Sequence, residues 1–258
     1  MGFKRFKLDP RVEQGLKNAG YEQATPIQAE AIPLVLEGHD LIGTAQTGTG
    51  KTAAFVLPIL HHLLTTPKKL ANKTRVLIVT PTRELAEQIH TVIAKLGHFT
   101  PIRSATVYGG VGMVPQERAL RQGVDIIVAC PGRLLDHLQR GTAKLDGVEI
   151  LVLDEADRML DMGFLPPIQQ ILQKVPAARQ TLLFSATFEK ALEQLIHKSM
   201  RVPKRVTLGH EAPAATVAHA IYPVNQHLKT KLLVTVLQGM TVSSVLIFTR
   251  TKHRADRV

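Results

Sequence analysis

Short apolar runs alternate along most of the chain with segments of helical periodicity. The runs are mostly apolar throughout rather than alternating with polar residues, which is typical of strands buried on both faces of a parallel sheet. Between them, segments such as 83–97 (RELAEQIHTVIAKLG) have apolar residues at helical spacing. The predicted strands lie within 39–43, 75–80, 104–109, 125–130, 150–154 and 181–186. This alternation predicts a doubly wound α/β domain, in which ligands bind at the carboxyl ends of the strands.

The pattern changes after residue 209. Residues 210–218 are rich in alanine and lack clear periodicity, which indicates a linker, although a short surface loop would fit the same composition. Beyond them, a helical pattern at 227–239 and a strand-like run at 244–250 (SVLIFTR) indicate the beginning of a second domain. We therefore expect a first domain at 1–209, a linker at 210–218 and an incomplete second domain at 219–258.

Composition is ordinary for a soluble globular protein, with 45% hydrophobic and 21% charged residues. No apolar stretch approaches the roughly 18 residues of a membrane-spanning helix, and the N-terminus lacks the apolar core of a signal peptide. A single cysteine, Cys130, excludes an internal disulfide and fits a reducing compartment. These features predict a cytoplasmic protein that does not associate with a membrane.

The charge balance adds a candidate partner. There are 32 Lys and Arg residues against 21 Asp and Glu, which gives a formal net charge of +11 and a pI near 10.0. Such an excess is typical of proteins that bind a polyanion, although a solvated basic surface explains it equally well at this point. Only 4% of residues are aromatic and there is no Trp, so contacts to a phosphate backbone are favoured over the stacking of many bases.

A glycine-rich stretch, GTAQTGTGKT at 43–52, separates one predicted strand from a predicted helix. From Ala45 to Thr52 it is close to the phosphate-loop pattern G-x-x-x-x-G-K-[ST], with Ala45 in place of the first glycine. Glycines let several backbone N–H groups face an anion at the positive end of the following helix. Lys51 would then reach the β- and γ-phosphates, and the Thr52 hydroxyl would bind Mg²⁺. A flexible turn would explain the glycines alone but not their place between a strand and a helix.

A pair of acids follows the strand-like run at 150–153. Asp154 would hold Mg²⁺ through its outer shell, and Glu155 would position and deprotonate an attacking water. An acidic cap before a helix would explain one acid but not its combination with a phosphate loop. Together the two features predict hydrolysis of a nucleoside triphosphate.

The stretch DEAD at 154–157 is the motif that names the DEAD-box RNA helicases, and the chain resembles this family along its length. The matching segments are Phe3 ahead of GYEQATPIQ (20–28), AQTGTGKT (45–52), PTRELA (81–86), GG (109–110), PGR (131–133), DEAD (154–157), SAT (185–187) and LIFTRTK (246–252). RMLDMGF (158–164) and LLFSATF (182–188) make the chain most similar to the bacterial RhlE group. The resemblance implies a RecA-like P-loop NTPase domain that uses ATP and Mg²⁺.

The resemblance also implies roles for particular residues. Gln28 would read the adenine edge, with Tyr21 or Phe3 packing near the base, although an exposed helix residue is the alternative for Gln28. The nucleotide would be held by Ala45, Gln46, Thr47, Gly48, Thr49, Gly50, Lys51 and Thr52. Ser185 and Thr187 would couple the nucleotide site to the domain interface through Asp157, although hydroxyl residues at a strand end are also common helix caps.

Further positions match those that contact the RNA backbone in the family: Pro81, Thr82, Arg83, Gly109, Gly110, Gly132 and Arg133. Glycines, helix N-termini and arginines suit phosphates and sugars, so the resemblance implies RNA binding with little sequence preference. The chain departs from the family at Cys130, where the motif usually begins with Thr. Because a thiol is a weak donor, the hydrogen bond that a threonine hydroxyl would make there is in question.

The family's second domain carries a motif like H-R-x-G-R, and nothing after Arg250 matches it. We therefore expect the chain to contain the first RecA-like domain and the start of the second, and to be nearly inactive without the remainder of the second domain. The leading hypothesis is an ATP-dependent RNA helicase, and the alternative is a nucleotide-switched RNA clamp. A small-molecule kinase lacks support, because no motif for a phosphoryl acceptor is present. The sequence does not identify protein partners.

Overall fold

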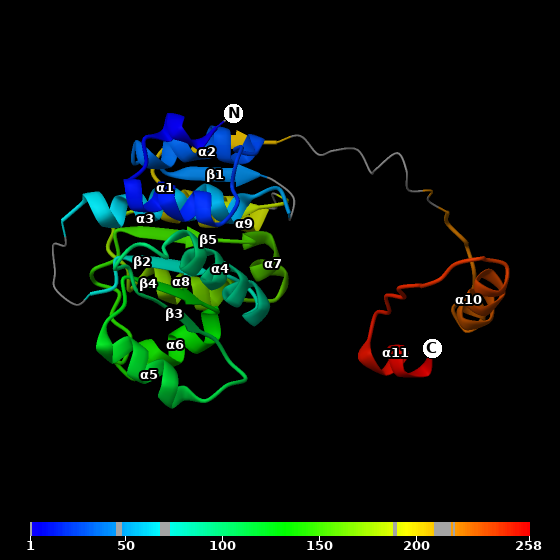
Figure 1. The fold of residues 1–258 in the computed structure, drawn as a ribbon. Helices are drawn as coiled ribbons and strands as arrows, with labels where there is room; N and C mark the ends of the chain where they lie inside the picture. Colours follow the sequence, from blue (N-terminus) through cyan, green and yellow to red (C-terminus); the bar gives the residue numbers. More distant parts are fainter. Residues whose placement is uncertain (1, 45–47, 68–72, 188–189, 209–217, 219) are drawn as a thin grey trace. The chain divides into compact units, whose positions relative to one another are not determined.

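The structure, a computed structural model, describes residues 2–44, 48–67, 73–187, 190–208, 218 and 220–258 (Figure 1). Contacts group the chain into two units, Met1–His210 and Glu211–Val258. The predicted linker at 210–218 lies outside the described residues except for residue 218, so its boundaries stay a prediction. Ala45, Gln46 and Thr47 of the predicted phosphate loop also lie outside them.

The first unit is built on a parallel sheet, which confirms the predicted fold class. Within the described residues the sheet has seven strands in the order β3-β4-β2-β5-β6-β1-β7, and every neighbouring pair is parallel. Figure 1 shows the sheet running from β1 near the top to β3 near the bottom of the unit. The strands are β1 (Leu41–Thr44), β2 (Val76–Val79), β3 (Ser104–Val107), β4 (Ile126–Ala129), β5 (Ile150–Leu153), β6 (Gln180–Ser185) and β7 (Lys204–Thr207).

Helices cover both faces of this sheet, which explains why its inner strands, such as β2, β4 and β5, are apolar throughout. Along β2, for example, Val76 and Ile78 belong to one buried cluster, whereas Leu77 and Val79 belong to the other. The helices are η1 (Phe3–Phe6), α1 (Pro10–Asn18), α2 (Pro26–Leu36), α3 (Lys51–Thr65), α4 (Arg83–Leu96), α5 (Met113–Gln122), α6 (Pro131–Gln139), α7 (Ala156–Asp161), α8 (Leu165–Leu172) and α9 (Lys190–Ser199). Helices α1 to α4 contribute to the first cluster, and α6 to α9 contribute to the second.

The second unit contains η2 (Gln226–Leu228), α10 (Lys229–Gln238) and α11 (Lys252–Arg257). The helix predicted at 227–239 is therefore confirmed, but the strand predicted at 244–250 is wrong, because these residues form no strand in the structure. Their side chains are largely exposed, with Leu246 at 79% and Phe248 at 87%. A strand needs a hydrogen-bonded neighbour, and the described part of this unit provides none.

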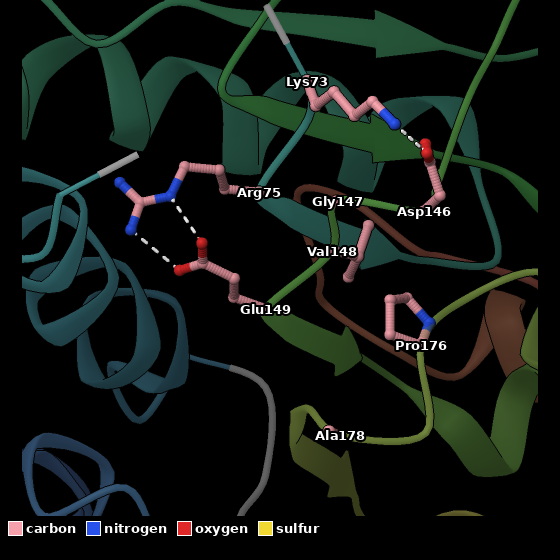
Figure 2. A pocket seen from close by; sticks show the side chains of 8 residues that line it. All are labelled: Lys73, Arg75, Asp146, Gly147, Val148, Glu149, Pro176 and Ala178. Atoms are coloured by element: carbon pink, nitrogen blue, oxygen red, sulfur yellow. Dashed lines mark hydrogen bonds and ion pairs between the residues drawn. The ribbon is translucent and has the colours of Figure 1, made fainter. Parts of the chain in front are cut away.

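A buried ion pair joins the amino ends of β2 and β5, at the opposite edge of the sheet from the predicted ligand site. The Arg75 guanidinium donates from Nε to Glu149 Oε1 (3.0 Å), from Nη2 to Glu149 Oε2 (2.8 Å) and from Nη1 to the Leu63 carbonyl (3.2 Å). His62 Nε2 lies 2.8 Å from Glu149 Oε2. Burial opposes ionisation of Glu149, but the hydrogen bonds from Arg75 and His62 hold the pKa of its carboxyl below the usual value. Figure 2 shows the paired hydrogen bonds of Arg75 and Glu149 beside a cavity of about 170 Å³. A second ion pair, between Lys73 and Asp146, also lines this cavity.

Arg75→Met should therefore destabilise the first unit by about 3 kcal/mol, because it breaks a buried pair and leaves the Glu149 charge without its main partner. Lys73→Met is the matched control: Asp146 is 56% exposed, so losing that pair should cost less than about 1 kcal/mol. Chemical denaturation at pH 7 measures both changes, and equal losses would contradict the prediction.

The same ion pair should make stability depend on pH. Folding lowers the pKa of Glu149, so the contribution of this carboxylate to the free energy of unfolding is present above its unfolded pKa of about 4.3. That contribution is lost as the pH falls through the pKa of the folded state. The difference between wild type and Arg75→Met should shrink accordingly at acid pH.

Candidate functional site

Three segments meet at the carboxyl edge of the sheet because β5, β6 and β1 are parallel neighbours. The glycine-rich loop leads from β1 into α3, the acids at 154–157 follow β5, and residues 186–187 follow β6. The order of the strands therefore brings together the phosphate loop, the acidic motif and the SAT motif, which are far apart in the sequence.

The described part of the phosphate loop has the backbone that its glycines allow. Gly48 and Gly50 have φ values of 89° and 93°, in the left-handed region that glycine adopts without steric cost. Gly50 is the N-cap of α3, so Lys51 and Thr52 stand in the first turn of that helix. A Cβ on Gly50 would lie only 2.6 Å from Gln28 Nε2. The loop therefore places backbone N–H groups and a helix N-terminus at the sheet edge, an arrangement suited to phosphate.

Lys51 and Asp154 are charged residues in the interior of this site, with exposures of 7% and 5%. Burial raises the pKa of the Asp154 carboxyl to about 6; the Lys51 charge acts to lower it, and the Glu155 carboxylate acts to raise it. A buried carboxylate is an unfavourable group that packing alone does not require, and such groups cluster at functional sites. Its oxygens are also the ligands that Mg²⁺ prefers.

The donor groups predicted for the metal, a carboxylate and a hydroxyl, are ones that Mg²⁺ accepts. Within the described ranges, no group of three or more His, Cys, Asp or Glu side chains could hold a metal ion. Mg²⁺ is usually bound by one or two carboxylates together with substrate phosphates and water. Asp154 and the Thr52 hydroxyl are the residues of this chain that fit such a role.

Glu155 has a strained backbone at the start of α7. Its φ and ψ are 51° and 52°, in the left-handed region, and it is the N-cap of the helix. Such a conformation costs a non-glycine residue roughly 1–3 kcal/mol and is common at functional sites. The Glu155 N–H donates to Asp154 Oδ1 (3.1 Å), and Arg158 Nη1 donates to Glu155 Oε2 (3.2 Å).

Asp157 links α7 to the end of β6. Its Oδ2 accepts hydrogen bonds from the Ala186 N–H (3.0 Å), the Thr187 N–H (2.9 Å) and the Thr187 hydroxyl (3.0 Å). Burial opposes its ionisation, but these bonds and one from the Arg158 N–H lower the pKa of Asp157. The Ser185 hydroxyl donates to the Thr187 carbonyl (2.6 Å). The structure thus brings together the three residues predicted to couple the site, and their role stays a prediction.

Gln28 is buried, at 2% exposure, so the alternative of an exposed helix residue is wrong. Its Oε1 accepts from the Thr25 N–H (3.0 Å), and its Nε2 donates to the Gly50 carbonyl (3.1 Å). Gln28 therefore connects the start of α2 to the last glycine of the phosphate loop.

Phe3 and Tyr21 lie together, with ring centroids 6.1 Å apart in an edge-to-face arrangement. They line a cavity of about 740 Å³ between η1, α1 and residues 20–22. The structure therefore places the two aromatic residues side by side at the edge of a cavity. Their contact with adenine stays a prediction.

The predicted RNA-contacting residues follow β2, β3 and β4, which are neighbours in the other half of the sheet. Thr82 is the N-cap of α4 and accepts from the Leu85 N–H (3.3 Å), while Pro81 and Arg83 flank it. Gly109 and Gly110 follow β3, and Gly110 has a left-handed φ of 78°. These residues lie on backbone turns and at a helix N-terminus.

Gly132 and Arg133 stand in the first turn of α6, after β4. Arg133 Nη1 donates to the Val111 carbonyl (3.0 Å), which ties this turn to the loop after β3. The seven predicted positions are therefore brought to one edge by three neighbouring strands.

Sequence reasoning missed Tyr108. The Arg83 guanidinium lies over its ring, 5.1 Å from the centroid, and its hydroxyl donates to Glu87 on α4. Tyr108 thereby contacts a predicted RNA-contacting arginine. Its place directly before Gly109 was the available signal.

Cys130 is the N-cap of α6, and its side chain makes no capping hydrogen bond. Burial raises the pKa of the thiol to about 11, so it is neutral at physiological pH. The cap bond that a threonine hydroxyl could accept is therefore missing, in line with the weak acceptor strength of sulfur. Pro131 at the first position of the helix lacks an N–H and so reduces the need for a cap.

The fold and the glycine-rich loop between β1 and α3 define a P-loop NTPase domain of the RecA-like type. Residues 25–195 match the DEAD/DEAH box helicase family, so the chain belongs to that family. It is 43% identical over 257 residues to the ATP-dependent RNA helicase CshA of Listeria monocytogenes, covering 99% of this chain and 49% of that protein. It is 42% identical over 263 residues to RhlB of Xanthomonas axonopodis pv. citri, covering 99% of this chain and 46% of that protein.

A solved structure has the same fold: a hypothetical ATP-dependent RNA helicase from Sulfolobus tokodaii, with a TM-score of 0.71 and 36% identity over 78% of this chain and 57% of the other. The family predicted from the motifs is confirmed, whereas membership of the RhlE group stays a prediction. The chain spans about half the length of CshA and RhlB. None of the helices in the described residues is long and apolar enough to cross a membrane.

Proposed function

We propose that this chain is the ATP-binding part of an ATP-dependent RNA helicase, an RNA-stimulated ATPase that separates short duplexes. The observation that supports this function best is the meeting of three groups at one sheet edge. These groups are the N-terminus of α3, the oppositely charged and buried side chains of Lys51 and Asp154, and the side chain of Glu155, which follows Asp154. Family membership and the names of the relatives support the same function.

In the proposed mechanism the backbone of the phosphate loop and Lys51 hold the β- and γ-phosphates of ATP. Mg²⁺ would be held by the Thr52 hydroxyl and, through water, by Asp154, and it would neutralise charge on the phosphates. Glu155 orients the attacking water and accepts its proton, the role of a general base. Gln28 and the pair of Phe3 and Tyr21 select adenine, because a site built to hydrogen-bond one base edge rejects a base that leaves it unpaired.

The RNA strand would lie across the carboxyl ends of β2, β3 and β4, on the predicted RNA-contacting residues. Helix N-termini, glycine turns and arginines bind phosphates and sugars and carry little sequence information. The excess of Lys and Arg over acidic residues would add salt-dependent attraction. Asp157, Ser185 and Thr187 would couple this surface and the nucleotide to a second RecA-like domain. We place the protein in the cytoplasm, as its cysteine usage predicts.

The test is an ATPase and strand-displacement assay on this chain extended through a complete second RecA-like domain. We expect ATP hydrolysis that RNA stimulates, and displacement of a short RNA strand that requires ATP. Stable retention of RNA with a non-hydrolysable ATP analogue, without strand displacement, would instead indicate the nucleotide-switched clamp. Hydrolysis that RNA does not affect would contradict both functions.

Adenine selectivity should depend on Gln28. Gln28→Ala should weaken ATP binding by about 1–3 kcal/mol, because it removes the buried amide that would hydrogen-bond the adenine edge. GTP binding, already weak, should change little. Titration with fluorescent nucleotides measures both, and Gln88→Ala on the exposed side of α4 is the control. Equal affinities of the unsubstituted chain for ATP and GTP would contradict adenine recognition without any variant.

A further inference from the structure

An arginine contacts the proposed general base. Arg158 follows Glu155 by three residues on α7, and its Nη1 donates to Glu155 Oε2 at 3.2 Å. The carboxylate side of this pair is 13% exposed, whereas the guanidinium side is 56% exposed. A solvated arginine thus reaches back to a carboxylate that is largely enclosed in the site.

The acids of this turn are held in different ways. Asp154 lies in the field of Lys51, and Asp157 accepts hydrogen bonds from the segment after β6. Glu155 is contacted by the Arg158 guanidinium. The Arg158 N–H in turn donates to Asp157 Oδ1 (3.0 Å), so the backbone from which the guanidinium extends is fixed within the same turn.

The backbone conformation of Glu155 explains why the contact with Arg158 matters for the orientation of the Glu155 carboxylate. Because Glu155 is a left-handed N-cap, it stands outside the regular helix, whose packing restricts side-chain rotation in the following residues. A glutamate also has several rotatable bonds, and its ordering has an entropic cost. The Arg158 guanidinium reaches the Glu155 carboxylate from the first turn of α7, so it can restrict that carboxylate from outside the site.

We propose that Arg158 is a positioning residue for the hydrolytic reaction, and that its guanidinium keeps the Glu155 carboxylate in the orientation that receives the proton of the attacking water. This inference rests on the function proposed above. Arg158 contacts no reacting atom in this role and acts only through Glu155. A pair with one partner more than half exposed contributes little to stability, so its removal should affect turnover and not folding.

The test uses Arg158→Gln in the chain extended through a complete second domain. We expect kcat for ATP to fall by about 10-fold, less than the roughly 100-fold that a 1 Å misplacement of a catalytic group can cost, with the KM for ATP unchanged. Arg158→Lys should recover part of the loss, because a cation is kept at the same place. Arg118→Gln, at an exposed arginine of α5, is the control and should have no effect. Thermal denaturation should give the same midpoint for all of these variants.

A double variant separates this inference from the proposed function. In the Glu155→Gln background, Arg158→Gln should cause no further loss, because the group that it positions has already been removed. An independent loss in that background, or a raised KM with unchanged kcat, would overturn the positioning role. Normal hydrolysis by Glu155→Gln alone would instead show that Glu155 is not the base, and the proposed mechanism would fail first.

Discussion

Lys51→Ala is expected to lower the affinity of the chain for ATP by at least about 100-fold, which corresponds to roughly 3 kcal/mol. The lysine stands in the first turn of α3, beyond glycines whose backbone is shaped to face phosphate. Its ammonium is buried, so a charge-assisted hydrogen bond to phosphate would form in a site partly shielded from water. Alanine supplies neither the charge nor the hydrogen bond.

A second effect of the substitution acts through Asp154. The Lys51 charge opposes the rise in the pKa of that buried carboxyl, which is already about 6. Without Lys51 the pKa should rise further, so that less of the carboxylate is ionised at neutral pH. Because a protonated carboxyl attracts Mg²⁺ and its bound water less than a carboxylate does, Mg²⁺ would bind less well, and the loss of nucleotide affinity should be larger in the presence of Mg²⁺ than without it.

Calorimetric or fluorescence titration of this chain with ATP, with and without Mg²⁺, measures both effects. Lys95→Ala, at an exposed lysine of α4, is the control and should bind ATP normally. Nearly unchanged binding by Lys51→Ala would show that the glycine-rich loop does not hold phosphate.

The parts of the fold that could be predicted from sequence are those with a strong local signal. Strands β1 to β6 each overlap their predicted ranges, and the inner ones are apolar because helices cover both faces of the sheet. Strand β7 was not predicted, because at the edge of the sheet only Val206 of its four residues is buried, and KRVT has no pattern of its own. Residues 244–250 show the reverse: their apolar sequence predicts a strand, but pairing is a tertiary property that local sequence does not supply.

In the candidate site, too, the features with a local sequence signal were predicted and the tertiary contacts were not. The phosphate loop and the acidic motif were predicted because each has a fixed spacing that reflects its chemistry, and parallel strand order explains why they meet. The contact of Gln28 with the Gly50 carbonyl joins residues 22 apart, and the pair of Arg75 and Glu149 joins residues 74 apart. Such contacts depend on the packing of α2 on α3 and of β2 beside β5, so no spacing in the sequence indicates them. The left-handed backbone of Glu155 was likewise unpredictable, because glutamate rarely adopts it.

Glu155→Gln is expected to retain ATP and Mg²⁺ while losing hydrolysis by about 10²–10⁴-fold in the chain extended through a complete second domain, the range that general base catalysis contributes. Glutamine has nearly the same size and should keep the backbone N–H bond to Asp154, but its amide cannot accept the proton of water at neutral pH. The Glu155 carboxylate also raises the pKa of Asp154, so its removal should favour the ionised, metal-binding form of that residue. Nucleotide affinity should therefore be unchanged or slightly higher, the opposite of the result for Lys51→Ala.

Single-turnover hydrolysis and nucleotide titration of the same preparation distinguish this outcome from a general loss of the site. Glu193→Gln, at an exposed glutamate of α9, removes one negative charge elsewhere and should leave both measurements unchanged. Loss of nucleotide binding by Glu155→Gln would mean that the carboxylate supports the structure of the turn rather than the reaction. Hydrolysis at the normal rate would mean that a group other than Glu155 accepts the proton of water. The remaining acids of the turn are Asp154 and Asp157, and Asp157 is already hydrogen-bonded to Thr187.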